Sequence, residues 1–206
     1  MFNDETFFLK THNALCSIKN NSFTNKNNAK AAIYVVRDPR NVITSLSHHY
    51  NMNIEEAFNF MTDSKITLVD KKNYASVIQV LGDWSNNFQS WKSIKFAPLL
   101  IVKYEDLIKD TKKTFLSILN FLKNFMDIKI DENKILKTIE SCSFENLSKK
   151  EEIEGFKESI YSKKKDKKLK FFYLGKKNNW QNLLNPEMEQ KTREAFQKEM
   201  KELGYI

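Results

Sequence analysis

Three short, nearly continuous apolar runs stand out along the chain, and each of them leads into polar or ionisable residues. They cover residues 6–10 (TFFLK), 31–36 (AAIYVV) and 99–103 (LLIVK). A strand that is covered on both faces has this pattern, which is typical of a parallel sheet. We therefore predict three buried strands whose polar ends meet at one edge of a sheet.

Apolar residues at helical spacing lie between and after these runs. Two helices are predicted around residues 115–122 and 135–139, with Asp110 and Asp131 as their N-caps. A further helical face, at steps of four and three residues, is formed by Val77, Leu81, Trp84, Phe88 and Trp91.

The last predicted helix has clear boundaries at both ends. Asn185 can cap it, Pro186 suits its first position and Gly204 can end it. Because strands alternate with helices along the chain, we predict an α/β fold.

Length and composition indicate one domain with a full core. The chain has 206 residues, 41% of them hydrophobic. No run approaches the roughly 18 to 20 apolar residues of a membrane helix, and the first residues do not form a signal peptide. Only Cys16 and Cys142 are present, which excludes a disulfide scaffold and a Cys-based zinc site. We expect a cytoplasmic protein without a membrane span.

The net charge of +8 favours acidic partners such as nucleic acid, phosphate esters or sulfate esters. Asn and Lys are abundant throughout, however, and arginine occurs only three times. An arginine in an anion site is therefore more informative than the overall charge. An RNA-binding protein ranks last among the hypotheses, because the chain has neither an RNP-like aromatic motif nor an arginine-rich stretch, and we expect no nucleic-acid partner.

The strongest local motif is YVVRDPRNV at residues 34–42. Arg37 ends a predicted strand, Asp38 can cap a helix, and Pro39 suits the first helical position. A guanidinium beside a helix N-terminus forms an anion site at the sheet edge where α/β folds bind ligands. Ser45, near the start of this helix, could add a hydrogen bond. The alternative is that Arg37 pairs with a carboxylate such as Asp38.

A second strand end, FLKTH at residues 8–12, carries two ionisable groups. The imidazole of His12 can act as a general base near pH 7, and Lys10 could stabilise negative charge on a reacting oxygen. Taken alone, a hydrogen-bonded loop histidine beside a solvated lysine is the commoner arrangement. His48 and His49 lie on a predicted helix and are interpreted as surface or packing residues.

Two further segments of the chain carry candidate site residues. VKYEDL at residues 102–107 runs from a strand into an acidic helix start, which suits the helix dipole. Tyr104 in this segment is expected at the same sheet edge as Arg37 and His12. FFYLGKKNNW at residues 171–180 places Gly175 in a lysine loop that could wrap a phosphate; an ordinary surface loop is the alternative.

Several common motifs are absent from the sequence. There is no P-loop, no G-x-G-x-x-G, no G-x-S-x-G and no cluster with metal-ligand spacing. These absences argue against a dinucleotide dehydrogenase and against a metal-dependent hydrolase, and we expect no metal.

Taken in order, these segments resemble the sulfotransferase family that uses 3′-phosphoadenylyl sulfate (PAPS). The resemblance covers nearly the whole chain, as a single domain over residues 1–206. It implies a P-loop-NTPase-like three-layer sandwich around a central parallel sheet, and transfer of a sulfuryl group from PAPS to a hydroxyl or amine of a small molecule or glycan. It rests on FLKTHN, YVVRDPRNVITSL, GDW, VKYEDL, SFENL and GKKNNW.

The resemblance also implies roles for individual residues. His12 would be the general base, and Lys10 would stabilise charge near the transferred group. The residues implied to bind the nucleotide are Arg37 and Ser45 at the 3′-phosphate, Tyr104 beside them, Ser143 and Phe144 at the adenine, and Gly175, Lys176 and Lys177 in the segment of residues 171–180, called the late loop below.

Two departures from the family pattern qualify this picture. The late loop lacks the family's Arg-Lys before Gly175, and Lys176 and Lys177 are expected to replace that charge. The family's first strand and its 5′-phosphosulfate-binding loop have no counterpart before Phe7. We therefore expect an N-terminally truncated domain.

Three explanations of this truncation are open. A fragment of a longer enzyme is favoured over a non-catalytic relative that retains only 3′-phosphonucleotide binding, and over a chain completed by a partner. Acceptor specificity is expected in the loops at residues 20–30, 52–72 and 151–170.

Overall fold

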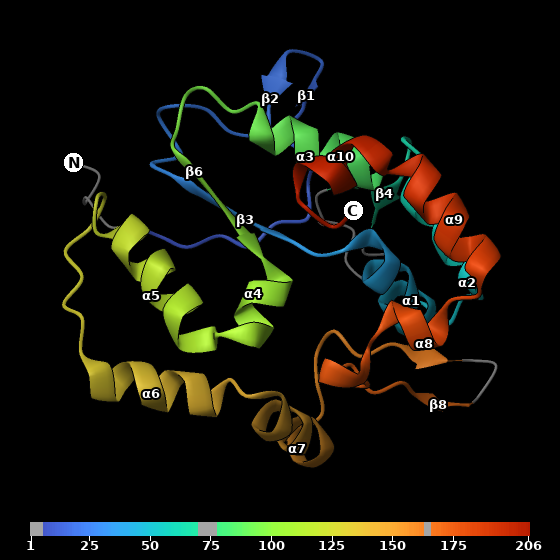
Figure 1. The fold of residues 1–206 in the computed structure, drawn as a ribbon. Coiled ribbons are helices and arrows are strands. Elements are labelled where there is room, and N and C mark those ends of the chain that lie inside the picture. Colours follow the sequence, from blue (N-terminus) through green and yellow to red (C-terminus); the bar gives the residue numbers. More distant parts are fainter. Residues whose placement is uncertain (1–5, 70–77, 163–165) are drawn as a thin grey trace.

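A parallel pair of strands forms the centre of the computed structural model, which describes residues 6–69, 78–162 and 166–206. Strands β3 (Ala32–Val36) and β6 (Leu99–Lys103) pair in register from Ala32 opposite Leu99 to Val36 opposite Lys103. Both strands lie where the apolar runs predict them. Figure 1 shows the pair running through the middle of the molecule, with helices on either side, which confirms an α/β fold with a parallel sheet.

Short antiparallel pairs and helices make up the rest of the described chain. The antiparallel pairs are β1 (Ser17–Ile18) with β2 (Asn21–Ser22), β4 (Thr67–Leu68) with β5 (Gln79–Val80), and β7 (Tyr161–Ser162) with β8 (Lys167–Lys168). The helical elements are α1 (Pro39–His49), α2 (Ile54–Thr62), α3 (Trp84–Lys92), α4 (Tyr104–Lys109), α5 (Thr111–Leu122), α6 (Glu132–Ser141), α7 (Phe144–Glu154), the 3-10 turn η1 (Gly175–Lys177), α8 (Trp180–Leu183), α9 (Pro186–Ala195) and α10 (Gln197–Glu202).

Local capping explains where several helices begin. Asp38 accepts a hydrogen bond from the backbone N–H of Arg40 at the start of α1, and Pro39 occupies the first turn. Asp110, Asp131 and Asn185 cap α5, α6 and α9 in the same way. These four helix starts confirm the predictions made from the sequence.

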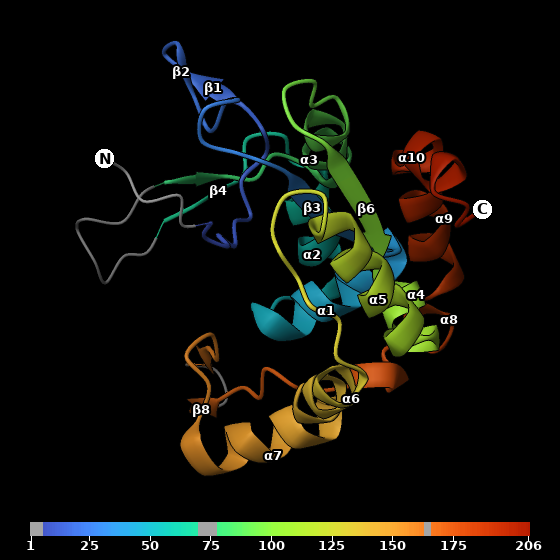
Figure 2. The same cartoon turned by 90° about the vertical axis from the view of Figure 1, so that its left-hand side faces the viewer.

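The main helical core lies between the first and last helices. Its fully buried members come from α1, α2 and the C-terminal helices, so segments far apart in the sequence enclose one apolar cluster. They are Ile43, Ala57, Met61, Phe196 and Met200. Figure 2 shows α6 and α7 at the opposite end of the molecule from the β1–β2 hairpin.

The prediction of a strand over residues 6–10 is wrong. This segment has no strand conformation, and the side chains of Phe7, Phe8 and Leu9 are 73%, 66% and 89% exposed. A strand exists only when a neighbouring strand pairs its backbone N–H and C=O groups. None of the described strands pairs with this segment.

The predicted helix from Val77 to Trp91 begins later than its apolar spacing indicates. Val77 lies outside the described residues, and residues 79–80 form β5. The helix begins at Trp84 because Asp83 caps it by accepting from the backbone N–H of Asn86. The last predicted helix is also interrupted: the backbone at Phe196, with φ −118° and ψ 19°, separates α9 from α10.

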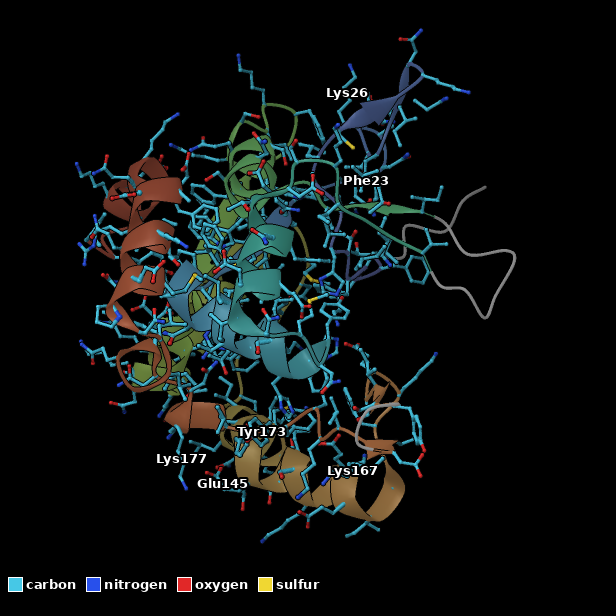
Figure 3. All side chains as sticks on the ribbon, turned by 90° about the vertical axis from the view of Figure 1, so that its right-hand side faces the viewer. Phe23, Lys26, Glu145, Lys167, Tyr173 and Lys177 are labelled. Atoms are coloured by element: carbon cyan, nitrogen blue, oxygen red, sulfur yellow. The ribbon has the colours of Figure 1, made fainter. Side chains whose placement is uncertain are left out.

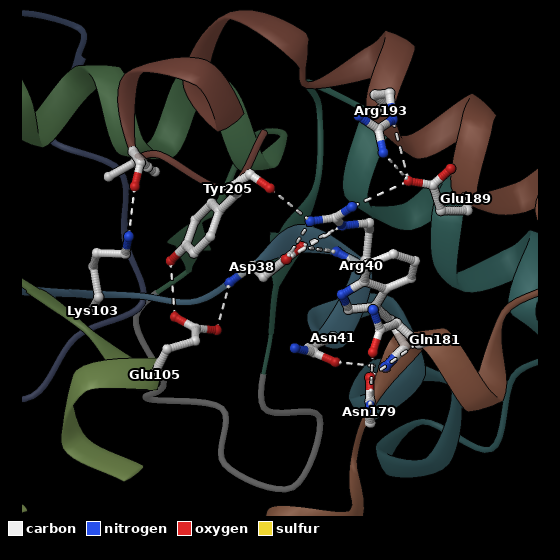
Figure 4. Close-up of polar contacts among 12 residues, drawn as sticks. Asp38, Arg40, Asn41, Lys103, Glu105, Asn179, Gln181, Glu189, Arg193 and Tyr205 are labelled. Atoms are coloured by element: carbon white, nitrogen blue, oxygen red, sulfur yellow. Dashed lines mark hydrogen bonds and ion pairs between the residues drawn. The ribbon is translucent and has the colours of Figure 1, made fainter. Parts of the chain in front are cut away.

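A buried polar network, shown in Figure 4, holds the carboxyl ends of β3 and β6. Arg40 is 4% exposed, and its guanidinium binds the Asp38 carboxylate at 2.7 Å, Glu189 at 3.1 Å and the carbonyl of Tyr205 at 3.0 Å. Glu105 accepts hydrogen bonds from the backbone N–H of Asp38 and from the Tyr205 hydroxyl. The C-terminal residues therefore fix the strand ends from which Arg37 and Tyr104 project.

Among the described residues, no helix combines the length and the apolar character that crossing a membrane requires.

Candidate functional site

Three of the predicted nucleotide-binding residues meet at the carboxyl ends of β3 and β6. Arg37 follows β3 directly, and its Nη1 donates to the Ser45 hydroxyl oxygen at 3.3 Å. Its guanidinium carbon also lies 4.5 Å from the centre of the Tyr104 ring, at the start of α4. The structure thus gathers Arg37, Ser45 and Tyr104 beside the N-terminus of α1.

Among the described residues, no carboxylate forms an ion pair with the guanidinium of Arg37. The alternative of an Arg37–Asp38 pair does not occur, because Asp38 binds Arg40. The Nε atom of Arg37 is buried and has no hydrogen-bond partner among the described residues. Burial lowers the pKa of Arg37, and the nearby Tyr104, Glu105 and Asp38 oppose this shift. A half-buried cation with an unused donor suits a phosphate or sulfate group.

The late loop packs against α1 and α7 through specific contacts. The Tyr173 ring stacks on the His48 ring, with centroids 3.7 Å apart and planes at 4°. Glu151 accepts hydrogen bonds from the backbone N–H groups of Phe171 and Phe172 at 2.7 and 2.9 Å. These contacts hold the loop over the C-terminal half of α1.

Gly175 lies directly against the ring of Phe144. Its φ is +53°, and a Cβ atom there would lie 2.8 Å from Cδ2 of Phe144. Phe144 also makes an edge contact with Phe172. Two residues predicted to bind the nucleotide are therefore in contact, because only glycine leaves room for the ring.

Ser143 and the two lysines of the loop are placed differently. Ser143 is the N-cap of α7, and its hydroxyl oxygen accepts from the backbone N–H of Asn146 at 3.2 Å. Lys176 and Lys177 lie in η1 with exposed side chains. Figure 3 shows Lys177 on the outside of the molecule, at the end that also carries Tyr173 and Glu145. The replacement of the family's lost charge by these lysines stays a prediction.

The predicted catalytic pair, His12 and Lys10, contacts other parts of the fold: His12 lies beside α3, and Lys10 contacts Glu158. The carbonyl of His12 accepts from Asn87 Nδ2 at 3.2 Å, and the Oδ1 of Asn87 accepts from the Tyr34 hydroxyl on β3 at 3.0 Å. The Nζ of Lys10 forms an ion pair with Glu158 at 2.9 Å. Partial desolvation lowers the pKa of His12, Lys10 lowers it further, and Glu158 opposes both. A histidine with this shift is neutral at pH 7 and can accept a proton.

The next residue anchors this histidine to the fold. The Asn13 carbonyl accepts from the Trp91 indole N–H at 2.8 Å, and its Oδ1 accepts from the backbone N–H of Val80 at 2.7 Å. Asn13 is buried, so the backbone that carries His12 is held between α3 and β5.

Sequence reasoning missed two residues at these sites. Asn178 is buried against α1 and donates to the Ser45 hydroxyl oxygen at 3.0 Å. Glu158 pairs with Lys10 from a segment 148 residues away. In a chain this rich in Asn, Lys and Glu, neither residue type carries a signal of its own.

The described residues contain no group of three or more His, Cys, Asp or Glu side chains that could hold a metal ion. Apart from this, the candidate site consists of Arg37, Ser45 and Tyr104, whose cationic group could bind an anion, with His12 and Lys10 on another segment.

Comparisons with known proteins show to which family the chain belongs. Residues 3–204 match the family model described as a sulfotransferase domain. The luciferin sulfotransferase of Photinus pyralis is 30% identical over 142 residues, which are 69% of this chain and 35% of that protein. The amine sulfotransferase of Oryctolagus cuniculus is 26% identical over 182 residues, covering 86% of this chain and 56% of that protein.

Among solved structures, the mouse sulfotransferase SULT7A1 in complex with PAP has a similar fold. The TM-score is 0.57 at 20% sequence identity, over 83% of this chain and 58% of that one. The chain thus spans between about a third and just under three fifths of the length of these relatives.

Proposed function

Because the chain belongs to the sulfotransferase domain family, we propose that it binds PAPS and transfers the sulfuryl group to a hydroxyl or amine acceptor. The observation that carries the proposal is Arg37, a half-buried guanidinium that contacts Ser45 and Tyr104 and has an unused buried Nε. We assign this cluster to the 3′-phosphate of the nucleotide. The names of the relatives, which refer to luciferin and amines, support a small-molecule acceptor, and the name of a third relative, the cytosolic sulfotransferase 17 of Arabidopsis thaliana, supports a cytoplasmic setting.

The proposed reaction uses His12 as the general base. The acceptor oxygen or nitrogen attacks sulfur and gives its proton to the neutral imidazole, while the bond from sulfur to the phosphate oxygen breaks. Adenosine 3′,5′-bisphosphate leaves with the electron pair of that bond. Lys10 stabilises charge on the oxygens around sulfur, in the manner of cationic groups in phosphoryl transfer. Ser143 and Phe144 lie at the adenine in this proposal, and the loop of Gly175, Lys176 and Lys177 wraps a phosphate of the nucleotide.

Calorimetric titration with adenosine 3′,5′-bisphosphate tests the nucleotide site. We expect binding by the folded chain and a loss of about 10- to 100-fold in affinity for Arg37→Ala, because a hydrogen bond to a charged group contributes about 1.5 to 3 kcal/mol. Arg193→Ala is the matched control, since Arg193 pairs with Glu189 on α9. A chain that is folded by circular dichroism and does not bind would contradict the proposal.

A non-catalytic module that only binds a 3′-phosphonucleotide is the second candidate. The ion pair between Lys10 and Glu158 favours it, because this contact occupies the ammonium group that catalysis would use. Release of adenosine 3′,5′-bisphosphate from PAPS in the presence of phenol or amine acceptors distinguishes the two. Turnover that disappears in His12→Gln supports the enzyme, whereas binding without turnover supports the module.

A further inference from the structure

The side chain of Asn178 connects the late loop to α1 and contacts Ser45 of the candidate anion site. Asn178 is 8% exposed. Its Nδ2 donates to the carbonyl of Asn41 at 3.1 Å and to the hydroxyl oxygen of Ser45 at 3.0 Å. Its Oδ1 accepts from the hydroxyl of the buried Thr44. Every hydrogen of this amide is therefore engaged by α1.

These partners determine which way the amide faces. The Asn41 carbonyl can only accept, so the NH₂ group of Asn178 must lie on that side. The second N–H then points at Ser45, which makes Ser45 an acceptor in this contact.

The hydroxyl of Ser45 is consequently oriented as a donor to a ligand. Its oxygen accepts from Asn178 and also from Nη1 of Arg37 at 3.3 Å, and neither partner can accept a proton in return. No acceptor for the Ser45 hydroxyl hydrogen occurs in the described part of the chain. Because Ser45 is exposed, this hydrogen is free to bind an anion beside the Arg37 guanidinium.

We propose that Asn178 is a positioning residue that turns the Ser45 hydroxyl into a donor for the 3′-phosphate of the nucleotide. This inference rests on the proposed function. It assigns to the late loop a role in the phosphate site that does not depend on its lysines: the loop acts through the amide of Asn178.

A pair of isosteric substitutions tests the inference by calorimetry with adenosine 3′,5′-bisphosphate. Asn178→Asp keeps the oxygen that accepts from Thr44 and replaces the donor to Ser45 with an acceptor, so the serine hydrogen turns toward the protein. We expect a loss of about tenfold or more in affinity. Asn179→Asp adds the same charge one residue away, where the side chain caps α8 and contacts the Gln181 side chain, and is expected to stay within about twofold of the parent.

A double-mutant cycle asks whether Asn178 acts through Ser45. In that case Asn178→Ala weakens binding in the parent chain and has little further effect in the Ser45→Ala background. Additive losses would contradict the inference, because a merely structural role of Asn178 does not depend on the serine hydroxyl. This cycle also decides the question if Asn178→Asp does not fold.

The outcomes separate this inference from the function on which it rests. A folded parent chain that does not bind adenosine 3′,5′-bisphosphate overturns both. Binding that is weakened by Arg37→Ala, but is equal in Asn178→Asp and Asn179→Asp, overturns the positioning role alone.

Discussion

Glu105 and Asp38 join the ends of the two parallel strands although 67 residues separate them in the sequence. One carboxylate oxygen of Glu105 accepts from the backbone N–H of Asp38 at 3.1 Å, and the other accepts from the Tyr205 hydroxyl at 3.0 Å. The residue that begins α1 is thereby fixed to the start of α4. Because Arg37 immediately precedes Asp38, the same contact restrains the backbone that carries Arg37.

Loss of this carboxylate should destabilise the fold. Glu105→Ala leaves the Asp38 N–H and the Tyr205 hydroxyl without their acceptor, and we expect the free energy of unfolding to fall by about 2 kcal/mol or more. Asp106→Ala removes an equivalent charge from the same helix turn at an exposed position and should cost no more than about 1 kcal/mol. Urea unfolding of the two variants measures the difference, and equal losses would contradict the account.

Substitution of Arg40 should mainly lower the stability of the fold, whereas substitution of Arg37 should mainly weaken nucleotide binding. Arg40→Gln leaves the buried carboxylate of Asp38 without its cation, which typically costs about 3 to 5 kcal/mol. Arg37→Gln removes a guanidinium that no carboxylate contacts and should change the unfolding free energy far less, while it abolishes most of the nucleotide affinity. Thermal unfolding combined with calorimetry distinguishes the two arginines; a large stability loss in Arg37→Gln would be inconsistent with its role as a ligand-binding residue.

Gly175→Ala should disturb the late loop through Phe144. The substitution combines a positive φ, which costs an alanine about 1 to 2 kcal/mol, with a Cβ atom 2.8 Å from the Phe144 ring. Gly204→Ala is the control, because Gly204 has a φ of +68° and open space around it. We expect Gly175→Ala to be the less stable of the two in urea unfolding and to bind adenosine 3′,5′-bisphosphate more weakly. If both variants unfold at the same urea concentration, the close approach of Gly175 to Phe144 does not contribute to the free energy of unfolding.

Glu151 should contribute stability that depends on pH. Burial raises the pKa of its carboxyl group, but hydrogen bonds from Ser159, Phe171 and Phe172 outweigh burial and hold the pKa below its ordinary value of 4.5. A group with a lowered folded-state pKa stabilises the fold above its unfolded-state pKa and loses this contribution as the pH falls through the folded-state value.

Unfolding of the parent chain and Glu151→Gln at several pH values measures this contribution. The stability difference should be complete at pH 7 and should shrink below about pH 4. A difference that is the same at every pH would mean that the charge of Glu151 is not what holds the loop.

Lys10 should control the titration of His12. Lys10→Met removes a cation that lowers the pKa of His12 and leaves the anionic Glu158, which raises it. The His12 pKa should therefore rise toward its ordinary value of 6.5, and the acidic limb of any transferase activity should move to higher pH with it. An NMR titration of the histidine side chains measures the shift, with His12→Gln to assign the resonance. Lys137→Met, an exposed lysine on α6, should leave the titration unchanged.

Short-range features were predicted correctly because their causes lie within a few residues. Strands β3 and β6 follow from continuous apolar runs, and the starts of α1, α5, α6 and α9 follow from a capping side chain beside the first turn. The proximity of Arg37 and Ser45 can also be inferred from the sequence. Arg37 ends a strand and Ser45 lies eight residues later in the following helix, so both are close to the first turns of that helix.

The incorrect prediction and the residues that were missed depend on contacts between segments far apart in the sequence. The apolar run at residues 6–10 does not form a strand, because a strand depends on a neighbour that no local pattern specifies. The roles of Asn178, Glu105 and Glu158 arise from contacts that cross between 67 and 148 residues of sequence.

By itself, the sequence determined the family, the α/β class and the positions of the candidate anion-binding arginine and the candidate histidine. Only the tertiary structure decided that Asp38 binds Arg40 and leaves Arg37 free, and that Gly175 makes room for Phe144. It also brought the amide of Asn178 within hydrogen-bond distance of Ser45. The physical reason is the range of the interactions: capping and periodicity act within a helical turn, whereas partner choice among buried polar groups depends on which distant segments the core brings together.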